Sequence, residues 1–327
     1  MKLLLKIAYD GRKYHGLIDQ PEQNTVYSQI RSAMHRLKLP HSIKIECSGR
    51  TDKGVSAANM VLSLPIDKLG SYDVMFNNVL PDDIKVKEYA IINSDFSARF
   101  DCTRRVYRYF FHCENVDEYE RAGKALKEGL NSGKFHIRDF CTKSVERNFI
   151  KKMKKQSLSR MNDGDVVSNT RCKEWIEGSK RLKCDKMDLM HTKELPDGRV
   201  STTITEHYAE SVSNMCSSVD DQPATQFDQS FYDRNIDYLK FEKLNEIYYM
   251  EIASKSFLHN QIRRMFYFIK KNVGKKEVIF YEGLAEPEYL VFYQAHYDKE
   301  IEWKKSRKDN LILYEIEKEK HKMMFFE

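Results

Sequence analysis

The chain has 327 residues, 41% hydrophobic and 32% charged, so it is long enough for two domains and has the composition of a globular protein with a highly charged surface. Its formal net charge of +6 weakly favours a polyanionic partner. Its seven cysteines, with no Cys-x-x-Cys spacing, argue against a disulfide framework and a zinc ribbon. Without a signal-peptide pattern or an apolar run that could span a bilayer, we expect an intracellular protein with no membrane contact.

Hydrophobic periodicity predicts a regular series of elements in the first hundred residues. We expect a strand at 3–9, a helix beginning at Asn24 or Thr25, strands at 43–47 and 60–64, a helix at 74–79 and a strand at 84–90. The order strand, helix, strand, strand, helix, strand is that of a ferredoxin-like, RRM-like unit. Many unrelated functions share this topology, so it indicates fold and not activity.

The second part of the chain repeats some of these patterns. We expect a strand at 105–112, a helix at 117–130, a strand at 248–253, a helix at 258–270 and another helix from Lys275. A stretch at about 155–232 is rich in Ser, Asp, Lys and Thr with weak periodicity, which predicts an irregular insertion. We therefore divide the chain into an N-terminal α+β domain, 1–101, and a C-terminal α+β domain, 102–327.

The most informative segment is Gly-Arg-Thr-Asp-Lys-Gly-Val-Ser-Ala at 49–57. Asp52 lies between Arg50 and Lys53, and two cations beside a carboxylate keep it ionised and prepare a surface for phosphate. Glycines on both sides allow a sharp turn and close approach to a ligand. On spacing alone, a hairpin turn with a solvated charge cluster explains the segment equally well. A P-loop is excluded because no Gly-Lys-Ser/Thr follows.

This segment resembles the catalytic loop of the TruA-type tRNA pseudouridine synthases. Its form with Lys53, Val55 and Ser56 is most similar to the eukaryotic branch that modifies uridines 38 and 39 of tRNA. Further segments resemble the same family in the same order, at 10–16, 24–26, 95–111, 135–141, 256–265 and 285–293. Leu17 departs from the Trp of bacterial members, and the insertion matches no family motif. These departures leave the substrate range and the oligomeric state open.

The resemblance implies an isomerase that converts uridine to pseudouridine in the anticodon arm of tRNA without a cofactor or metal. It implies the pseudouridine synthase fold, which is α+β, with two RRM-like (ferredoxin-like) halves, mixed or antiparallel sheets flanked by helices, and an active-site cleft between the halves. It also implies a homodimer. Asp52 suits the role of nucleophile or base. The family motif pairs it with Arg263, for which we expect a bidentate contact to the carboxylate.

Other side chains are candidates for handling the base and the RNA. Tyr107 can stack on uracil and help to move the proton at C5, and Tyr109 is its rival because it shares the same strand face. A stacked uridine must be flipped out, and Arg50 could fill the vacated space or hold the phosphate. The remaining candidates for RNA binding are cations: Arg12, Lys13, Lys53, Arg104, Arg105 and Arg108.

Three alternatives remain at this stage. The protein could be a sibling synthase that acts on other tRNA positions or other RNAs. It could be a non-catalytic RRM-like RNA-binding protein, although it lacks the aromatic-rich RNP octapeptide. A carboxylate-based glycosidase would need a second acid, and no paired-carboxylate motif lies near Asp52. For the synthase we expect a location in the cytoplasm, the nucleus or both.

Overall fold

The computed structural model describes residues 1–39, 44–92, 95–142, 192–194, 200–202 and 234–306. The chain divides into two units, one made of Met1–Val145 with Tyr232–Glu327 and the other of Glu146–Phe231. In the second unit the described residues form an antiparallel pair, β6 (Thr192–Glu194) and β7 (Val200–Thr202). The rest of the predicted insertion at about 155–232 lies outside the described residues.

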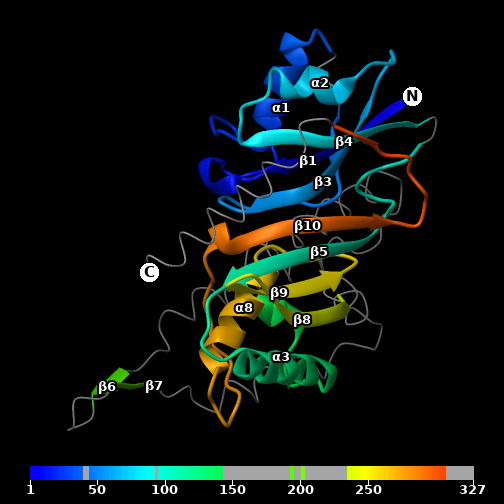
Figure 1. Ribbon diagram of the computed structural model, residues 1–327. Helices are drawn as coiled ribbons and strands as arrows, with labels where there is room; N and C mark the ends of the chain where they lie inside the picture. The colour runs from blue at the N-terminus through cyan, green and yellow to red at the C-terminus, as the bar shows by residue number, and fades with distance from the viewer. Residues whose placement is uncertain (40–43, 93–94, 143–191, 195–199, 203–233, 307–327) are drawn as a thin grey trace, which may run out of the picture. The chain divides into compact units, whose positions relative to one another are not determined.

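The first unit is built on one sheet (Figure 1). Within the described residues its strands run in the order β11-β4-β1-β3-β10-β5-β9-β8, with β2 paired to β3 beside this path. The strands are β1 (Lys2–Tyr9), β2 (Glu46–Cys47), β3 (Ser56–Pro65), β4 (Ile84–Ile92), β5 (Cys102–Phe111), β8 (Ile236–Leu244), β9 (Ile247–Ser254), β10 (Leu290–Tyr297) and β11 (Lys304–Lys305). The α-helices are α1 (Val26–Arg36), α2 (Tyr72–Asn77), α3 (Val116–Asn131) and α8 (Gln261–Asn272). The predicted α+β class is confirmed.

The sheet contains the same motif twice. The first half follows the order β1-α1-β2-β3-α2-β4, and its strands lie as β4-β1-β3-β2. The second half follows the order β5-α3-β8-β9-α8-β10, and its strands lie as β10-β5-β9-β8. In both halves the fourth strand lies beside the first, then the third and the second. The ferredoxin-like topology predicted for the first half is therefore also that of the second.

A short parallel pairing of β3 with β10 joins the halves into a continuous sheet. Ser56 pairs with Val291 and Ala57 with Phe292. The side-chain amide of Asn59 donates to the Tyr293 carbonyl at 2.8 Å, between residues 234 positions apart. The two halves thus share one sheet instead of each having its own.

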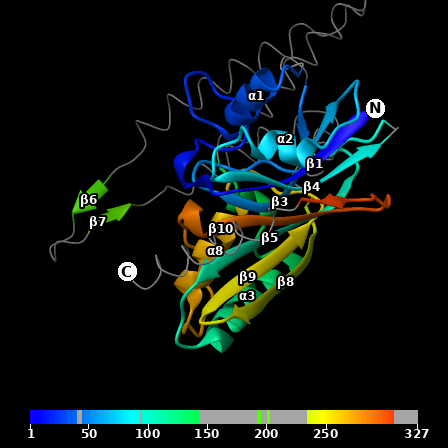
Figure 2. The same cartoon turned by 45° about the horizontal axis from the view of Figure 1, so that its top comes forward.

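All four described α-helices pack on one face of this sheet (Figure 2). Because side chains alternate along a strand, Leu3, Leu5 and Ile7 of β1 join the helices in the main core. Leu4 points the other way and packs with Phe96 in a separate cluster. The segment that resembles the catalytic loop contributes Val55 to the main core, so this packing positions the candidate site.

The four helices start and end within three residues of the predicted positions, and the one predicted helix that is absent lies after α8. Thr25 caps α1, and its side chain and that of Ser28 form a reciprocal capping box. The helix predicted from Lys275 is wrong. The side chain of Asn272 bonds to both the N–H and the carbonyl of Ile279, and Gly274 has a φ of 71°, so the chain turns back as a loop.

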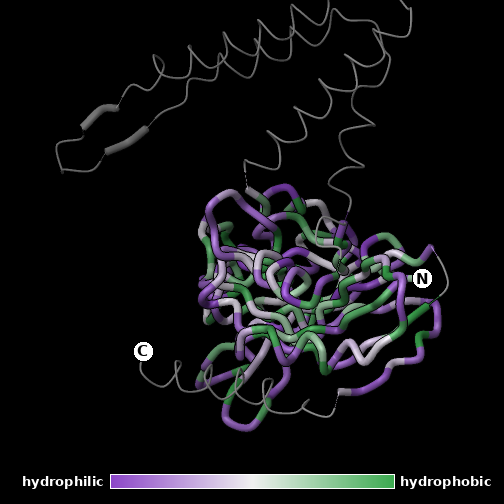
Figure 3. The backbone as a smooth tube through the Cα atoms, turned by 90° about the horizontal axis from the view of Figure 1, so that it is seen from above, coloured by the Kyte–Doolittle hydropathy of each residue, from purple (hydrophilic) through white to green (hydrophobic). Residues whose placement is uncertain are grey.

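Hydrophobic and hydrophilic residues are interleaved along the described backbone (Figure 3). This pattern matches strands that bury alternate side chains and helices that bury one face. Among the described residues, no helix combines the length and the apolar character needed to cross a membrane.

Candidate active site

The end of β1 and the segment after it form hydrogen bonds with the Asp52 loop, which connects β2 to β3. These bonds explain why the motif at 10–16 and the motif at 49–57 occur together. The hydrogen bonds run from Gly11 N–H to Ser56 Oγ (3.0 Å), from Gly54 N–H to the Tyr14 carbonyl (3.2 Å), from Leu17 N–H to the Thr51 carbonyl (3.2 Å), and between Tyr9 Oη and Thr51 Oγ1 (2.7 Å).

Gly11 lets the two segments touch. A Cβ at this position would lie 2.0 Å from the Val55 carbonyl oxygen, a backbone atom that cannot move without moving the loop. We expect Gly11→Ala to lower the free energy of unfolding by about 1–3 kcal/mol, as overpacking does. Thermal and urea unfolding would measure this loss.

The matched control is Gly70→Ala, because a Cβ at Gly70 would meet only ordinary contacts, the nearest at 3.4 Å. This variant should remain within about 0.5 kcal/mol of wild type, as most surface substitutions do. Equal unfolding curves for the two variants would contradict the proposed contact between Gly11 and the loop.

The Asp52 side chain is 30% exposed and contacts the second half of the molecule. Its Oδ1 lies 3.3 Å from Nε2 of His259, which is in the connection between β9 and α8. The other ring nitrogen, Nδ1, lies 2.8 Å from Thr142 Oγ1. The hydrogen bond to Asp52 raises the pKa of His259. The loop of the first half and the α8 end of the second half therefore meet at this carboxylate.

Arg263 lies near Asp52 but does not make the expected bidentate contact. No ion pair within 4.0 Å joins them in the described structure. Arg263 instead donates from Nε to the Ala285 carbonyl at 2.6 Å and from Nη1 to Asn260 Oδ1 at 3.2 Å. Burial lowers the pKa of its guanidinium, and the charge of Asp52 opposes that shift. The prediction of a direct contact is corrected because local acceptors hold this side chain.

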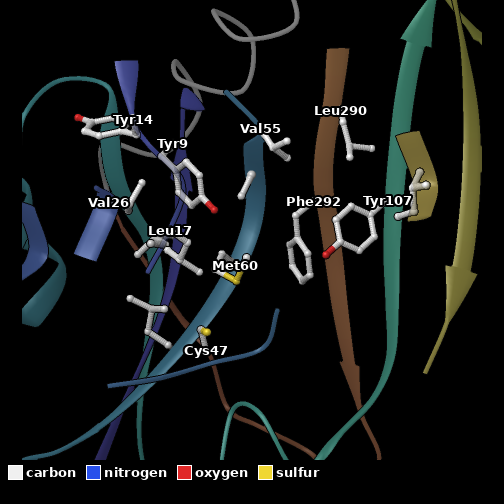
Figure 4. Packing of buried hydrophobic residues seen from close by; sticks show 14 of the residues in the cluster. Tyr9, Tyr14, Leu17, Val26, Cys47, Val55, Met60, Tyr107, Leu290 and Phe292 are labelled. Carbon is white, nitrogen blue, oxygen red and sulfur yellow. The ribbon is translucent and has the colours of Figure 1, made fainter. Parts of the chain in front are cut away.

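Tyr107 lies on β5 beneath the loop. Its ring makes edge contacts with Phe257 and Phe292, with centroids 5.3 Å and 5.1 Å apart. Figure 4 shows Tyr107 beside Phe292. The Tyr107 hydroxyl lies 3.4 Å from the Arg50 carbonyl, close to Asp52 in the loop. Burial raises the pKa of this phenol, so it is neutral at ordinary pH.

Comparison with known proteins adds a second line of evidence. No protein-family model matches the chain. Proteins named tRNA pseudouridine synthase A are similar to it. The Shewanella woodyi protein is 34% identical over 140 residues, which cover 42% of this chain and 51% of the relative. The Borrelia turicatae protein is 33% identical over 160 residues (45% and 64%), and that of Bacillus subtilis is 38% identical over 129 residues (37% and 51%).

These similarities support the TruA-type family that the sequence motifs indicate. The matched segments span between half and two thirds of the length of these three relatives. The relatives are all bacterial, and the similarity to the eukaryotic branch therefore rests on the motifs alone.

Tyr109, the rival to Tyr107, lies deeper in the second half. Its ring stacks on Phe266 with centroids 3.9 Å apart, and its hydroxyl donates to the Glu286 carbonyl at 3.0 Å. Both its ring and its hydroxyl are thus engaged by neighbouring residues of the second half. Of the two tyrosines, Tyr107 has its hydroxyl at the Asp52 loop.

The candidate RNA-binding cations fall into different settings. Arg50 and Lys53 are exposed on the loop itself. The others near the surface have acidic partners: Arg12 pairs with Asp10, Lys13 with Asp83 at 3.2 Å, and Arg104 with Asp237 at 2.8 Å. Such a cation would share its N–H donors between the carboxylate and a phosphate, or exchange one for the other.

Arg105 and Arg108 are engaged within the protein. The guanidinium of Arg105 donates to the backbone carbonyls of Ser48, Arg99, Cys102 and Lys255, and so connects the Asp52 loop to the second half. Arg108 lies on the sheet face opposite Tyr107, because strand side chains alternate. It pairs with Glu251 at 2.7 Å and stacks on Tyr293, 3.4 Å from the ring centroid. Neither arginine presents a free guanidinium beside Asp52.

His259 is the functional candidate that the sequence did not indicate. It lies inside the TruA-like segment 256–265, at the start of the helix predicted at 258–270, but a single histidine carries no spacing signal. Only the meeting of the two halves brings its ring to Asp52. No cluster of three or more His, Cys, Asp or Glu side chains suited to a metal occurs among the residues that the structure describes.

Proposed function

We propose that this chain isomerises uridine to pseudouridine in tRNA, with Asp52 as the catalytic carboxylate. The observation that carries the proposal is the convergence at Asp52 of side chains from both halves: His259 at 3.3 Å, the Tyr107 hydroxyl at the adjoining backbone, and Arg263, whose guanidinium pKa the charge of Asp52 raises. The relatives named tRNA pseudouridine synthase A support the same activity.

The reaction is an internal rearrangement. The N1–C1′ bond of uridine breaks, the uracil turns, and C5 bonds to C1′, while the proton at C5 leaves and N1 gains one. Asp52 acts as the nucleophile or base at the nucleoside, since one of its oxygens, Oδ2, has no partner within the described residues. No electrons are gained or lost, so the chemistry asks only for a carboxylate, a proton route and a pocket that retains the uracil.

The RNA must present the uridine outside its stack before Asp52 can reach it. The exposed Arg50 and Lys53 flank the carboxylate and suit contacts to the phosphates of the flipped nucleotide. The form of the loop with Lys53, Val55 and Ser56 favours positions 38 and 39 of the anticodon arm. The proposal also includes a homodimer located in the cytoplasm, the nucleus or both.

Mapping of pseudouridine tests this function. RNA from cells with and without the protein should differ at uridines 38 and 39 of tRNA, and the purified protein should release tritium from C5-labelled uridine in those tRNAs. A difference at other positions or in other RNAs would favour the sibling synthase. Binding of tRNA without any tritium release or change in the map would favour the non-catalytic RRM-like protein.

Tyr107→Phe should distinguish proton transfer by the Tyr107 hydroxyl from stacking by its ring. The variant keeps the ring against Phe257 and Phe292 and loses only the hydroxyl. We expect a loss of about 10²–10⁴-fold in the single-turnover rate, the usual range for general acid–base catalysis, with unchanged tRNA affinity. Tyr109→Phe is the control, since that hydroxyl bonds to the Glu286 carbonyl. Equal losses in the two variants would contradict the assignment of the proton route to Tyr107.

A further inference from the structure

We propose that His259 is a positioning residue for the reaction: its Nε2–H holds Oδ1 of Asp52, so that Oδ2 stays oriented toward the substrate. This inference rests on the proposed function and adds a residue to it. The ring is 48% exposed and belongs to the second half, whereas Asp52 belongs to the first. The contact therefore also connects the two halves at the reacting carboxylate.

The contact with His259 is the one side-chain interaction of the Asp52 carboxylate within the described residues. The terminal torsion of an aspartate is broad, so a carboxylate without a partner samples many orientations. Arg263, which was expected to orient it, is held by Ala285 and Asn260. The orienting role thus falls to the imidazole.

The contact with Thr142 is compatible with the required form of the imidazole. A threonine hydroxyl can donate or accept, so it can pair with Nδ1 whether that nitrogen carries a proton or not. Because the Asp52 carboxylate can only accept, the neutral ring that pairs with it carries its proton on Nε2, and Nδ1 accepts from Thr142. In the charged ring both nitrogens donate. The Nε2–H bond to Asp52 is therefore available on both sides of the His259 pKa.

The charges around the ring set its pH dependence. Asp52 faces it from the β2–β3 loop, and Arg263 and Arg264 face it from α8. The hydrogen bond to Asp52 raises the pKa of His259, while burial and the two arginines act against it. Below that raised pKa the bond joins a charged donor to a charged acceptor. As the pH rises through the pKa, the imidazole loses its charge, only the carboxylate remains charged, and the bond weakens.

Two substitutions in the full chain test the role. His259→Phe keeps a ring and removes the donor, and we expect a loss of about tenfold to a hundredfold in single-turnover pseudouridine formation, with tRNA affinity unchanged. His259→Gln keeps an N–H donor and should retain most of the rate. Wild type should slow as the pH rises through the His259 pKa, and the Gln variant should lack this step. His296→Phe and His296→Gln, at an exposed position of β10, are the matched controls and should change nothing.

A full rate in His259→Phe, or equal losses for the Phe and Gln variants at every pH, would overturn the positioning role. A second measurement does not depend on activity. The NMR titration of His259 should shift to lower pH in Asp52→Asn, because the raising partner has lost its charge. An unchanged titration would overturn the pairing itself. Absence of pseudouridine formation by wild type, with the titration shift present, would instead count against the proposed function.

Discussion

Replacing Asp52 with Asn is expected to abolish pseudouridine formation while leaving the fold and the affinity for tRNA intact. The amide has nearly the same shape as the carboxylate but lacks the charge and the nucleophilic oxygen. The side chain is 30% exposed and the amide keeps its volume, so the substitution should disturb little packing. We expect the single-turnover rate to fall on the order of 10⁴-fold or more, as when a nucleophile is removed. Tritium release from C5-labelled tRNA measures the rate, and filter binding measures the affinity.

The control for this experiment checks that the substituted asparagine has not deamidated back to aspartate. Mass spectrometry of the purified Asp52→Asn protein measures the deamidated fraction. Near-normal turnover by Asp52→Asn protein that is shown to be free of deamidated material would end the carboxylate mechanism.

Glu251→Ala should produce the largest loss of stability. Glu251 is buried on the sheet face opposite Tyr107, where it pairs with Arg108 at 2.7 Å and with Lys240 at 3.2 Å and accepts from the Tyr238 hydroxyl at 3.0 Å. Its removal leaves the Arg108 guanidinium without its counter-charge beside Tyr293. Breaking one partner of such a pair costs about 3–5 kcal/mol. Chemical denaturation measures the change in the free energy of unfolding.

The double variant Arg108→Met/Glu251→Met is the control, because apolar residues in place of both partners often restore stability. It also separates two interpretations of Arg108. If the double variant folds and binds tRNA as wild type does, Arg108 is structural, as its position opposite Tyr107 indicates. A weaker affinity of the double variant for tRNA at unchanged stability would indicate that Arg108 contacts the RNA. Unchanged unfolding of Glu251→Ala would show that the ion pair contributes nothing.

Periodicity predicted most of the strands and helices that are buried on one face, and the family resemblance indicated the strand at 290–293. Periodicity failed where burial is slight. The strand β8 was not expected, because it lies at the edge of the sheet and its side chains are only partly buried or exposed. The helix expected from Lys275 fails for a local reason, since the Asn272 side chain bonds to the backbone of Ile279. The single sheet shared by the halves could not be predicted either, because it depends on pairing between β3 and β10, far apart in the chain.

The candidate site shows the same division between local and distant information. The loop with Asp52 and the strand with Tyr107 were recognisable from their own residues. The partner of Asp52 was not, because the contact with His259 arises only when the two halves meet. Side chains alternate between the two faces along β5, and this alternation already places Arg108 on the face opposite Tyr107. The prediction that groups Arg108 with the other RNA-binding arginines does not take this alternation into account. The hydrogen bonds from Arg105 to backbone carbonyls could not be predicted from the sequence, because they depend on the three-dimensional structure.

The short parallel join between β3 and β10 has a consequence for how the protein folds. Each half forms mainly from its own strands and helices, whereas the bond from Asn59 to Tyr293 closes a loop of 234 positions. Contacts of such separation form slowly, because the chain entropy of closure is lost before the contact is gained. Docking of the halves is therefore expected to be a late kinetic step. Activity should return after secondary structure during refolding, since Asp52 and His259 meet only on docking.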